Sequence, residues 1–217
     1  MIRHSHTTSS ATRRKTGYRR VKRCLDVLMA MGILFATAPL WLAAAIVVRI
    51  GSPGPVFFTQ QRVGEAGKPF RIWKFRTMHV YQDGRDAPSV TVANDPRVFA
   101  AGVWLRRTKI DELPQLFNVL IGDMSLVGPR PTVAADYERM NARQKCRTEV
   151  PPGLTGLAQI SGNTSLSWPQ RIELDLQYVA GMSWRLDAYV LAKTFGLVAM
   201  GRAASDPPGT DEWQEAA

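Results

Sequence analysis

The sequence predicts a mainly helical α+β protein, in which a re-entrant membrane hairpin of the helix-break-helix type precedes a small cytosolic domain with short strands and interfacial amphipathic helices. One observation behind this prediction is the apolar run at residues 27–48, which contains no charged residue and has Pro39 near its middle. The other is the pattern after residue 50, where short strand-like and helical segments are separated by turns rich in glycine and proline. A chain of 217 residues has room for one such domain.

The apolar run is long enough to cross a bilayer, for which roughly twenty residues suffice, but its proline argues against a straight span. Pro39 removes a backbone hydrogen bond and clashes with the preceding turn, so the helix should bend between Ala38 and Pro39. Each half then has only about a dozen residues, which is too short to cross.

The charges around the apolar run favour the same topology. Positive charge marks the cytoplasmic side of a membrane segment, and here basic residues flank both ends: Arg13, Arg14, Lys15, Arg19, Arg20, Lys22 and Arg23 before it, and Arg49, Arg62, Lys68, Arg71, Lys74 and Arg76 after it. We therefore expect a hairpin that enters and leaves by one leaflet. A kinked spanning helix and a cleaved signal peptide are the alternatives.

Composition limits the partners. A formal net charge of +10 suits nucleic acid, lipid headgroups or nucleotide phosphates, and the membrane run favours the last two. Cys24 and Cys146 lie far apart with no CxxC or His-Cys cluster, so the sequence indicates neither a disulfide framework nor a zinc site. A reducing cytoplasm is the natural setting, and the three histidines carry no metal-ligand spacing.

Along the chain we expect a disordered basic N-terminal arm at 1–20, the re-entrant membrane hairpin at 21–50, the main domain at 51–200 and a flexible C-terminal tail at 201–217. Strands are predicted at 56–58 and 70–76, a polar surface loop at 82–97, a turn at 151–156 and a further strand at 157–160. Helices are predicted at 98–108, 114–121, 133–146, 168–181 and 184–200. The last of these is either a core helix or an amphipathic helix that lies flat in the headgroup region.

The main chemical signal is an acidic pair followed by an arginine between two prolines. Pro114 suits the first turn of a helix, which places Asp111 and Glu112 at or just before a helix N-terminus, where phosphate is also attracted. By itself the pair reads as an N-cap with an acidic first turn. Arg130 changes this interpretation, because Pro129 and Pro131 restrict its backbone and its guanidinium can approach phosphate at little ordering cost.

At this point the motifs carry a resemblance. Their order is similar to that of bacterial sugar transferases, and the chain resembles a small monotopic polyprenyl-phosphate phosphoglycosyl transferase over residues 21–200. The motifs are Lys22-Arg23 with Asp26, Ser52-Pro53-Gly54-Pro55-Val56-Phe57-Phe58, Gln61-Arg62-Val63-Gly64, Lys74-Phe75-Arg76-Thr77-Met78, Leu105-Arg106-Arg107-Thr108, Asp111-Glu112-Leu113-Pro114-Gln115, Gly122-Asp123-Met124-Ser125-Leu126-Val127-Gly128-Pro129-Arg130-Pro131 and Pro152-Gly153-Leu154-Thr155-Gly156. The family often has Ser-Pro at the hairpin break. Here Ala38 precedes Pro39, so we expect any hydroxyl–backbone hydrogen bond there to be lost.

The resemblance implies transfer of a hexose 1-phosphate from a UDP-sugar to undecaprenyl phosphate, with release of UMP, as the first step of exopolysaccharide or glycoconjugate synthesis. It also implies a catalytic domain on the cytoplasmic face of the bacterial inner membrane, in contact with membrane lipid. Asp111 would be the covalent nucleophile, with Glu112 as its partner and Mg²⁺ as cofactor on Asp111. The residue chemistry agrees, because an aspartate attacking phosphorus splits one displacement into two and a hard cation neutralises the developing charge.

Three further residues are candidates for phosphate or substrate binding: Arg130, Arg106 five residues before Asp111, and Asp175. For Arg106 and Asp175 a surface or helix-pairing charge is the alternative. Two rival functions stay open. One is a membrane-attached, non-enzymatic anion-binding module, which would gain nothing from carboxylates in its basic surface. The other is a direct-displacement transferase in which Asp111 is a metal ligand only. We expect no nucleic-acid partner, and no motif specifies the sugar or the oligomeric state.

Overall fold

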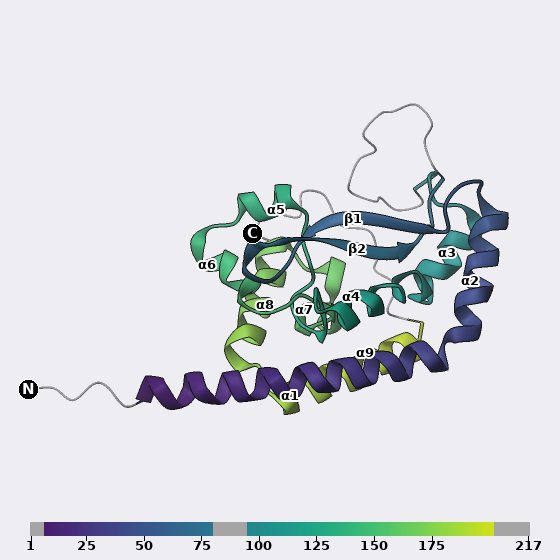
Figure 1. The fold of residues 1–217 in the computed structure, drawn as a ribbon. Coiled ribbons are helices and arrows are strands. Elements are labelled where there is room, and N and C mark those ends of the chain that lie inside the picture. The colour runs from purple at the N-terminus through teal and green to yellow at the C-terminus, as the bar shows by residue number, and fades with distance from the viewer. Residues whose placement is uncertain (1–6, 80–94, 202–217) are drawn as a thin grey trace, which may run out of the picture.

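In a computed structural model, which describes residues 7–79 and 95–201, the chain is mainly helical with two small sheets (Figure 1). The expected loop at 82–97 and tail at 201–217 therefore lie almost wholly outside the described residues. Helices α1 (Thr7–Ala36) and α2 (Ala38–Gly51) form a long bent pair along the base and one side of the molecule. The other described residues pack inside the angle between these two helices.

The bend in this pair is confirmed. α1 and α2 meet at Thr37 with an angle of 64° between Gly17–Ala36 and Ala38–Gly51, and Pro39 lies in the first turn of α2. No single helix in 7–79 or 95–201 is both long and apolar enough to cross a bilayer, whereas this bent pair passes that test of length and composition. The expected loss of a hydroxyl hydrogen bond at the break is wrong, because Thr37 Oγ1 donates to the carbonyl of Ile33 at 2.7 Å.

The start of α1 differs from the expected boundary. The helix begins at Thr7, so residue 20 is not the end of an irregular arm. Most residues between 11 and 23 are good helix formers, and no proline interrupts them. From Tyr18 onward, side chains of α1 also contact the rest of the molecule.

Strands β1 (Phe57–Val63) and β2 (Pro69–Phe75) form an antiparallel hairpin, joined by the short 3₁₀ helix η1 (Glu65–Gly67). β1 is longer than the predicted strand at 56–58, and β2 matches the prediction within one residue. The register pairs Phe58 with Lys74 and Arg62 with Phe70. Because side chains alternate between faces and paired residues share a face, Arg62 and Lys74 lie on the same side of the hairpin.

The helices that follow are α3 (Ala100–Arg107), η2 (Ile110–Glu112), α4 (Gln115–Ile121), α5 (Ala134–Arg139), α6 (Ala142–Lys145), η3 (Cys146–Glu149), α7 (Leu157–Ile160), η4 (Asn163–Ser165), α8 (Trp168–Gly181) and α9 (Trp184–Ala199). The predicted helices at 98–108, 114–121, 168–181 and 184–200 are confirmed as α3, α4, α8 and α9. The predicted helix at 133–146 is wrong as one element. It divides into α5 and α6, because Asn141 caps a new helix with a reciprocal Asn141–Gln144 capping box.

Two short predictions after residue 150 are also wrong. The expected turn contains strand β4 (Gly153–Thr155), which pairs in parallel with β3 (Ser125–Val127), and the expected strand at 157–160 is helix α7. Four residues carry too little periodicity to separate the two states. The parallel partner of β4 is also distant in sequence, so local pattern does not reveal it.

The core has two parts. The larger packs α4, β2, β3, α8 and α9 around Leu116, Val119, Tyr178 and Val190, and the smaller packs α2 against α3 and β2 around Val48, Phe75, Phe99 and Leu105.

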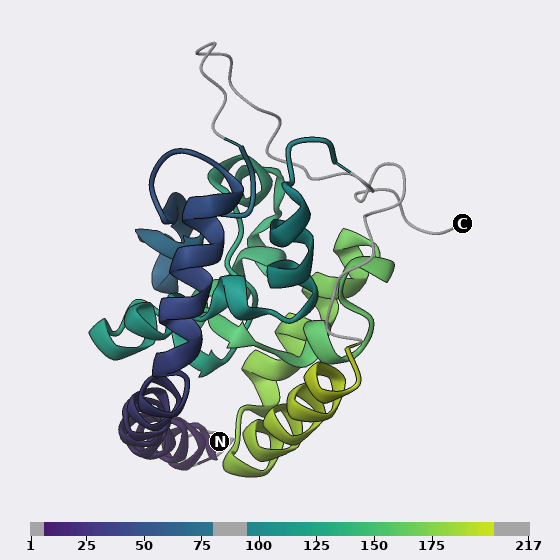
Figure 2. The same cartoon turned by 90° about the vertical axis from the view of Figure 1, so that its right-hand side faces the viewer.

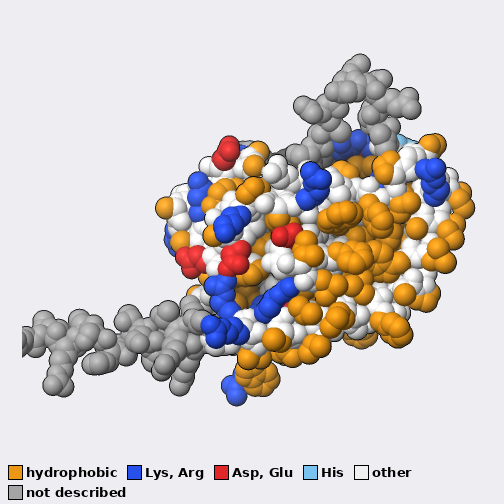
Figure 3. All heavy atoms as spheres, viewed as in Figure 1, with side chains coloured by type: hydrophobic (Ala, Val, Ile, Leu, Met, Phe, Trp, Pro, Cys, Tyr) orange, Lys and Arg blue, Asp and Glu red, His pale blue; other side chains and the backbone are white. Residues whose placement is uncertain are grey.

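Large apolar side chains also remain exposed along α1, α2, α4 and α9. Figure 3 shows this apolar surface across the region of α2, α4 and the C-terminal half of α1, whereas basic side chains gather towards the N-terminal part of α1.

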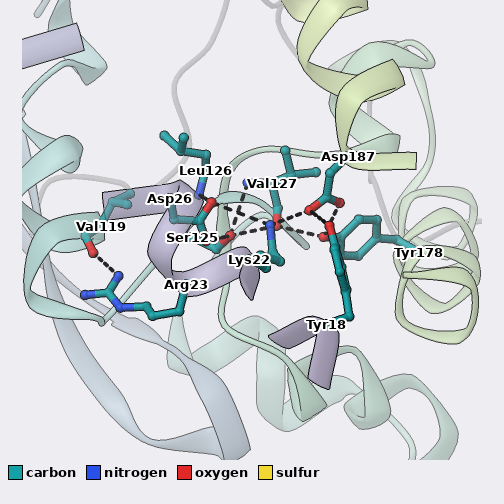
Figure 4. Close-up of polar contacts among 10 residues, drawn as sticks. All are labelled: Tyr18, Lys22, Arg23, Asp26, Val119, Ser125, Leu126, Val127, Tyr178 and Asp187. Carbon is teal, nitrogen blue, oxygen red and sulfur yellow. Dashed lines mark hydrogen bonds and ion pairs between the residues drawn. The ribbon is translucent and has the colours of Figure 1, made fainter. Parts of the chain in front are cut away.

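A buried polar cluster joins α1 to the domain (Figure 4). Lys22 Nζ lies 2.6 Å from Asp187 Oδ2 of α9 and 3.6 Å from Asp26. Asp26 in turn accepts a hydrogen bond from Ser125 Oγ of β3 at 2.7 Å, and the Tyr178 hydroxyl of α8 is 2.8 Å from Asp187 Oδ1. Figure 2 shows α1 nearly end-on, with α9 beside it along the base of the molecule. The cluster therefore fixes α1 against β3, α8 and α9.

Candidate functional site

The acidic pair lies where the sequence predicts, immediately before α4. Asp111 and Glu112 are in η2, and Pro114 is the N-cap residue of α4. Lys109 precedes η2 in a left-handed conformation with φ 59°, which turns the chain sharply between α3 and η2. Both carboxylates are largely buried, with 7% of Asp111 and 8% of Glu112 exposed.

Glu112 is held by two cations from distant parts of the chain. Its Oε1 atom lies 3.0 Å from Lys74 Nζ on β2 and 2.8 Å from Arg130 Nη2. Burial alone would raise the pKa of Glu112, but Arg130, Lys74 and Lys109 together hold this pKa well below its usual range. Glu112 is therefore ionised at neutral pH and fixes the two cations in place.

Asp111 has the opposite environment. Its Oδ1 atom is buried and has no hydrogen-bond partner among the described residues. Burial, and then the charge of Glu112, raise the pKa of Asp111, although Lys74, Lys109 and Arg106 act in the other direction. Oδ1 of Asp111 therefore keeps its hydrogen-bonding capacity for a ligand, whereas Oε1 of Glu112 is engaged by both Lys74 and Arg130.

The backbone of Arg130 is held in place by Arg147. Arg147 of η3 donates from Nη2 to the carbonyl oxygen of Arg130 at 2.8 Å, and its Nε lies 3.0 Å from Asp175 Oδ2. The Arg130 side chain is 39% exposed, so its guanidinium keeps donors for a ligand while one Nη holds Glu112.

The structure brings Asp111, Glu112 and Arg130 together, and it places the other two candidates differently. Arg106 Nε donates to Thr77 Oγ1 at 2.9 Å, and its guanidinium is close enough to Asp111 for the two charges to interact, although they form no direct ion pair. Asp175 is only 1% exposed and pairs with Arg147. Asp175 thus lies behind Arg130 rather than facing Asp111.

Sequence reasoning did not assign Lys74, Lys109 or Arg62 to the site. The signal for Lys74 was present in the strand pattern, because it lies two residues after the buried Ile72 and so shares the inward face of β2. Arg62 lies near Arg130 because Val63, at the end of β1, forms a β-bridge with Thr132. This pairing joins segments far apart in the sequence and has no local signature.

The site offers one carboxylate oxygen to a divalent cation. The described residues contain no group of three or more His, Cys, Asp or Glu side chains that could hold a metal ion by themselves. Mg²⁺, however, is commonly bound by one or two carboxylates together with substrate phosphates. The unpartnered Oδ1 of Asp111 suits that arrangement, whereas Glu112 is taken up by Lys74 and Arg130.

Comparison with known proteins identifies the family and several relatives of this chain. The model of the bacterial sugar transferase family matches residues 17–201. A UDP-glucose:undecaprenyl-phosphate glucose-1-phosphate transferase of Escherichia coli is 41% identical over 184 residues, covering 81% of this chain and 39% of that protein. The protein of the same name in Caulobacter vibrioides is 44% identical over 181 residues, covering 80% and 67%.

A shorter relative matches along most of its length. The exopolysaccharide production protein ExoY of Rhizobium meliloti is 36% identical over 199 residues, covering 84% of this chain and 87% of that protein. The chain thus spans about two fifths of the Escherichia coli relative and most of ExoY. Because the family model covers the hairpin, the acidic pair and the Pro-Arg-Pro segment in one continuous match, the chain belongs to the bacterial sugar transferase family.

Proposed function

We propose that this protein transfers glucose 1-phosphate, or a related hexose 1-phosphate, from a UDP-sugar to undecaprenyl phosphate by way of a covalent aspartyl intermediate on Asp111. The observation that carries the proposal is the contrast within the acidic pair. Glu112 is held by two cations, whereas Asp111 keeps a buried, unpartnered oxygen next to the same cations. The donor and acceptor are those in the names of the Escherichia coli and Caulobacter vibrioides relatives.

The reaction takes two displacements at one phosphorus. A carboxylate oxygen of Asp111 attacks the β-phosphorus of the UDP-sugar and forms a P–O bond, while the bond to the bridging oxygen breaks and UMP leaves with that electron pair. A phosphate oxygen of undecaprenyl phosphate then attacks the same phosphorus. The bond to Asp111 breaks, the carboxylate is restored, and undecaprenyl-diphosphate-sugar is the product.

The neighbouring side chains stabilise charge in both steps. Arg130 offers guanidinium N–H groups to the transferred phosphate, and Lys74 and Arg106 add positive charge near Asp111. Glu112 keeps Lys74 and Arg130 in position when no substrate is bound. Mg²⁺, held by Asp111 and substrate phosphates, would further neutralise the charge on the diphosphate.

The proposed setting is the cytoplasmic face of the inner membrane, with α1 and α2 as a re-entrant hairpin. The bend of 64°, the basic residues on both flanks and the exposed apolar side chains of α2, α4 and α9 support this arrangement. α9 buries Asp187 and Val190 while it exposes Trp184 and Phe195, as expected of a helix between a core and a lipid surface. By analogy with ExoY, the product would enter exopolysaccharide synthesis.

The test is UMP release from UDP-glucose by purified protein with Mg²⁺ and no lipid acceptor. We expect up to one UMP per active site, with a hexose phosphate attached to the peptide that contains Asp111 in mass spectrometry. Asp111→Asn should abolish both the burst and turnover, because an amide is a poor nucleophile. Glu112→Gln should impair turnover while Mg²⁺ still binds.

Two outcomes would replace this mechanism. If UMP appears only when undecaprenyl phosphate is present and no adduct forms, Asp111 acts as a metal ligand in a direct displacement. If no UDP-sugar yields UMP with the acceptor while the protein still binds anionic lipid, the protein is a membrane-attached anion-binding module.

A further inference from the structure

Arg62 is a half-buried arginine next to the site that the two displacements above do not use. It lies on the same face of the β1–β2 hairpin as Lys74. The bridge between Val63 and Thr132 brings the end of β1 against the Pro-Arg-Pro segment, where Arg62 Nη1 lies 3.5 Å from the carbonyl oxygen of Pro131. Arg62 and Arg130 are therefore neighbouring cations, since repulsion between them is among the main influences on Arg62.

Among the residues that the structure describes, Arg62 has no acidic side chain in contact with it, although a buried arginine usually has such a partner. In the described parts of the chain it makes no ion pair, and its Nε is buried without a hydrogen-bond partner. Nη2 donates to the neutral Gln60 side chain at 2.7 Å. Burial, and then Arg130, lower the pKa of Arg62 to about 10, while Asp136 and Glu112 offset part of this shift from a longer distance. Arg62 therefore stays charged at neutral pH.

The site consequently has more positive than negative charge. Lys74, Arg130 and Arg62 outnumber the carboxylates of Asp111 and Glu112, and a bound anion would balance the excess. The position of Arg62 indicates which anion. Lys74 and Arg130 both contact Glu112, the neighbour of Asp111, whereas Arg62 bonds to Gln60 and to the carbonyl of Pro131. Along β1, Arg62 also lies four residues from Phe58, the partner of Lys74, which is roughly 13 Å along the hairpin. Arg62 thus lies further from Asp111 than Arg130 does.

We propose that Arg62 and Arg130 together form one phosphate site that is used twice in each cycle, by the phosphate of UMP and then by the phosphate of the lipid acceptor. The inference rests on the proposed function. In an in-line displacement the leaving group departs opposite the attacking atom. UMP therefore leaves on the side away from Asp111, and the acceptor must attack the aspartyl-bound phosphorus from that same side. Both phosphates pass through one position, beyond the transferred phosphorus, where Arg62 lies.

Direct binding of UMP tests this site without turnover. Loss of a charge-assisted, forked donor should weaken UMP binding to Arg62→Gln by at least about tenfold in calorimetry of the full chain in detergent. Arg71→Gln is the matched control, because it removes the same charge from an exposed position on the opposite face of the hairpin and should bind UMP like the wild type. Unchanged UMP affinity in Arg62→Gln would overturn the assignment.

The shared use is tested with the acceptor. At saturating UDP-glucose, Arg62→Gln should also raise the KM for undecaprenyl phosphate by at least about tenfold, and UMP should inhibit the wild type competitively against that lipid. Weaker UMP binding with an unchanged KM for the lipid would overturn the shared site. If the Gln variant does not fold, Arg62→Lys provides the same comparison, since it keeps the charge but loses the fork. If the wild type shows no transfer at all, the proposed function fails, and the UMP titration still reports on Arg62.

Discussion

At the scale of single residues, the acidic pair combines two adjacent carboxylates with opposite environments. The pKa of Asp111 is raised by burial and by Glu112, whereas three cations outweigh burial and lower the pKa of Glu112. A raised pKa means that folding disfavours the ionised form of Asp111. A lowered pKa means that folding favours the ionised form of Glu112. At neutral pH, Asp111 therefore lowers the stability of the folded protein and Glu112 raises it. Such a contrast is expected where a reactive residue lies beside a residue that holds the site together.

This contrast predicts opposite effects of two isosteric substitutions on thermal stability. Asp111→Asn removes a desolvated charge without a partner, so the melting temperature at neutral pH should rise. Glu112→Gln leaves Lys74 and Arg130 without their counter-charge and should lower the free energy of unfolding by about 2 kcal/mol. That is less than the 3 to 5 kcal/mol of a fully buried pair, because Arg130 is 39% exposed. Thermal melts of both variants in the same detergent check this, and a loss of stability in Asp111→Asn would contradict it.

The raised pKa of Asp111 also predicts the pH dependence of the first displacement. Only the ionised carboxylate attacks, so the rate of the UMP burst should rise with pH through the pKa of Asp111. The acid limb should therefore lie above the ordinary aspartate value of 3.8. Glu112 adds no limb in that range, because its pKa is lowered. Rapid-quench measurement of UMP without acceptor gives the profile, with circular dichroism at each pH as the control for folding. A burst rate that stays constant down to the ordinary aspartate range would contradict the assignment.

Sequence reasoning was most successful where the site is local. Asp111 and Glu112 are adjacent to the helix start that Pro114 predicts, and two prolines single out Arg130. Lys74 and Arg62 reach Glu112 and Arg130 through strand register and a bridge to a distant segment, and local pattern contains neither. Asp175 was a candidate for substrate binding, but in the structure it pairs with the buried Arg147. The sequence around a polar helix residue does not show whether its partner is a buried arginine or a ligand.

At the scale of elements, length decided which predictions held. Helices α3, α4, α8 and α9 have seven or more residues with a clear apolar face or a capping signal, and all four were predicted. β4 and α7 have three and four residues, and both were assigned wrongly. β4 exists because it pairs in parallel with β3, and the intervening residues form the crossover. The same pairing sets the start of the Pro-Arg-Pro segment. β4, which was not predicted, therefore positions Arg130, which was.

The close approach of β3 and β4 predicts a severe effect of a small substitution. A Cβ atom at Gly153 would lie 2.1 Å from the backbone nitrogen of Gly128, which no side-chain movement can relieve. Gly153→Ala should therefore destabilise the protein by about 3 kcal/mol or more and shift the segment that carries Arg130. Gly196→Ala is the matched control, because a Cβ there meets nothing within 4 Å and α9 should gain up to about 1 kcal/mol. Chemical denaturation of both variants decides the matter, and equal stability would rule out the close packing.

At the scale of the whole molecule, the bent helix pair and the domain behave as one unit. Lys22 and Asp26 of α1 are buried against Asp187 of α9 and Ser125 of β3, so the bent helix pair is fixed to the domain through a polar cluster. Such a cluster allows few alternative arrangements, because each buried charge needs its partner. In the proposed re-entrant arrangement, the orientation of α1 therefore also sets the orientation of the site relative to the lipid surface.

This rigid link makes the topology testable by labelling exposed positions on both flanks of the hairpin. Single cysteines at Arg20 and Lys68, which are exposed, in a background without Cys24 and Cys146, should react with a membrane-impermeant maleimide in inverted vesicles and not in intact cells. A spanning helix would place the two positions on opposite sides, so labelling of either one in intact cells would contradict the re-entrant hairpin.

Pro39→Leu provides the complementary test. Without the proline, roughly 22 apolar residues can form a continuous span. In a fraction of the molecules, the cysteine at position 20 should then react from outside the cell, while the cysteine at position 68 stays protected. An unchanged labelling pattern would show that the buried polar cluster, rather than the proline, holds the hairpin in place.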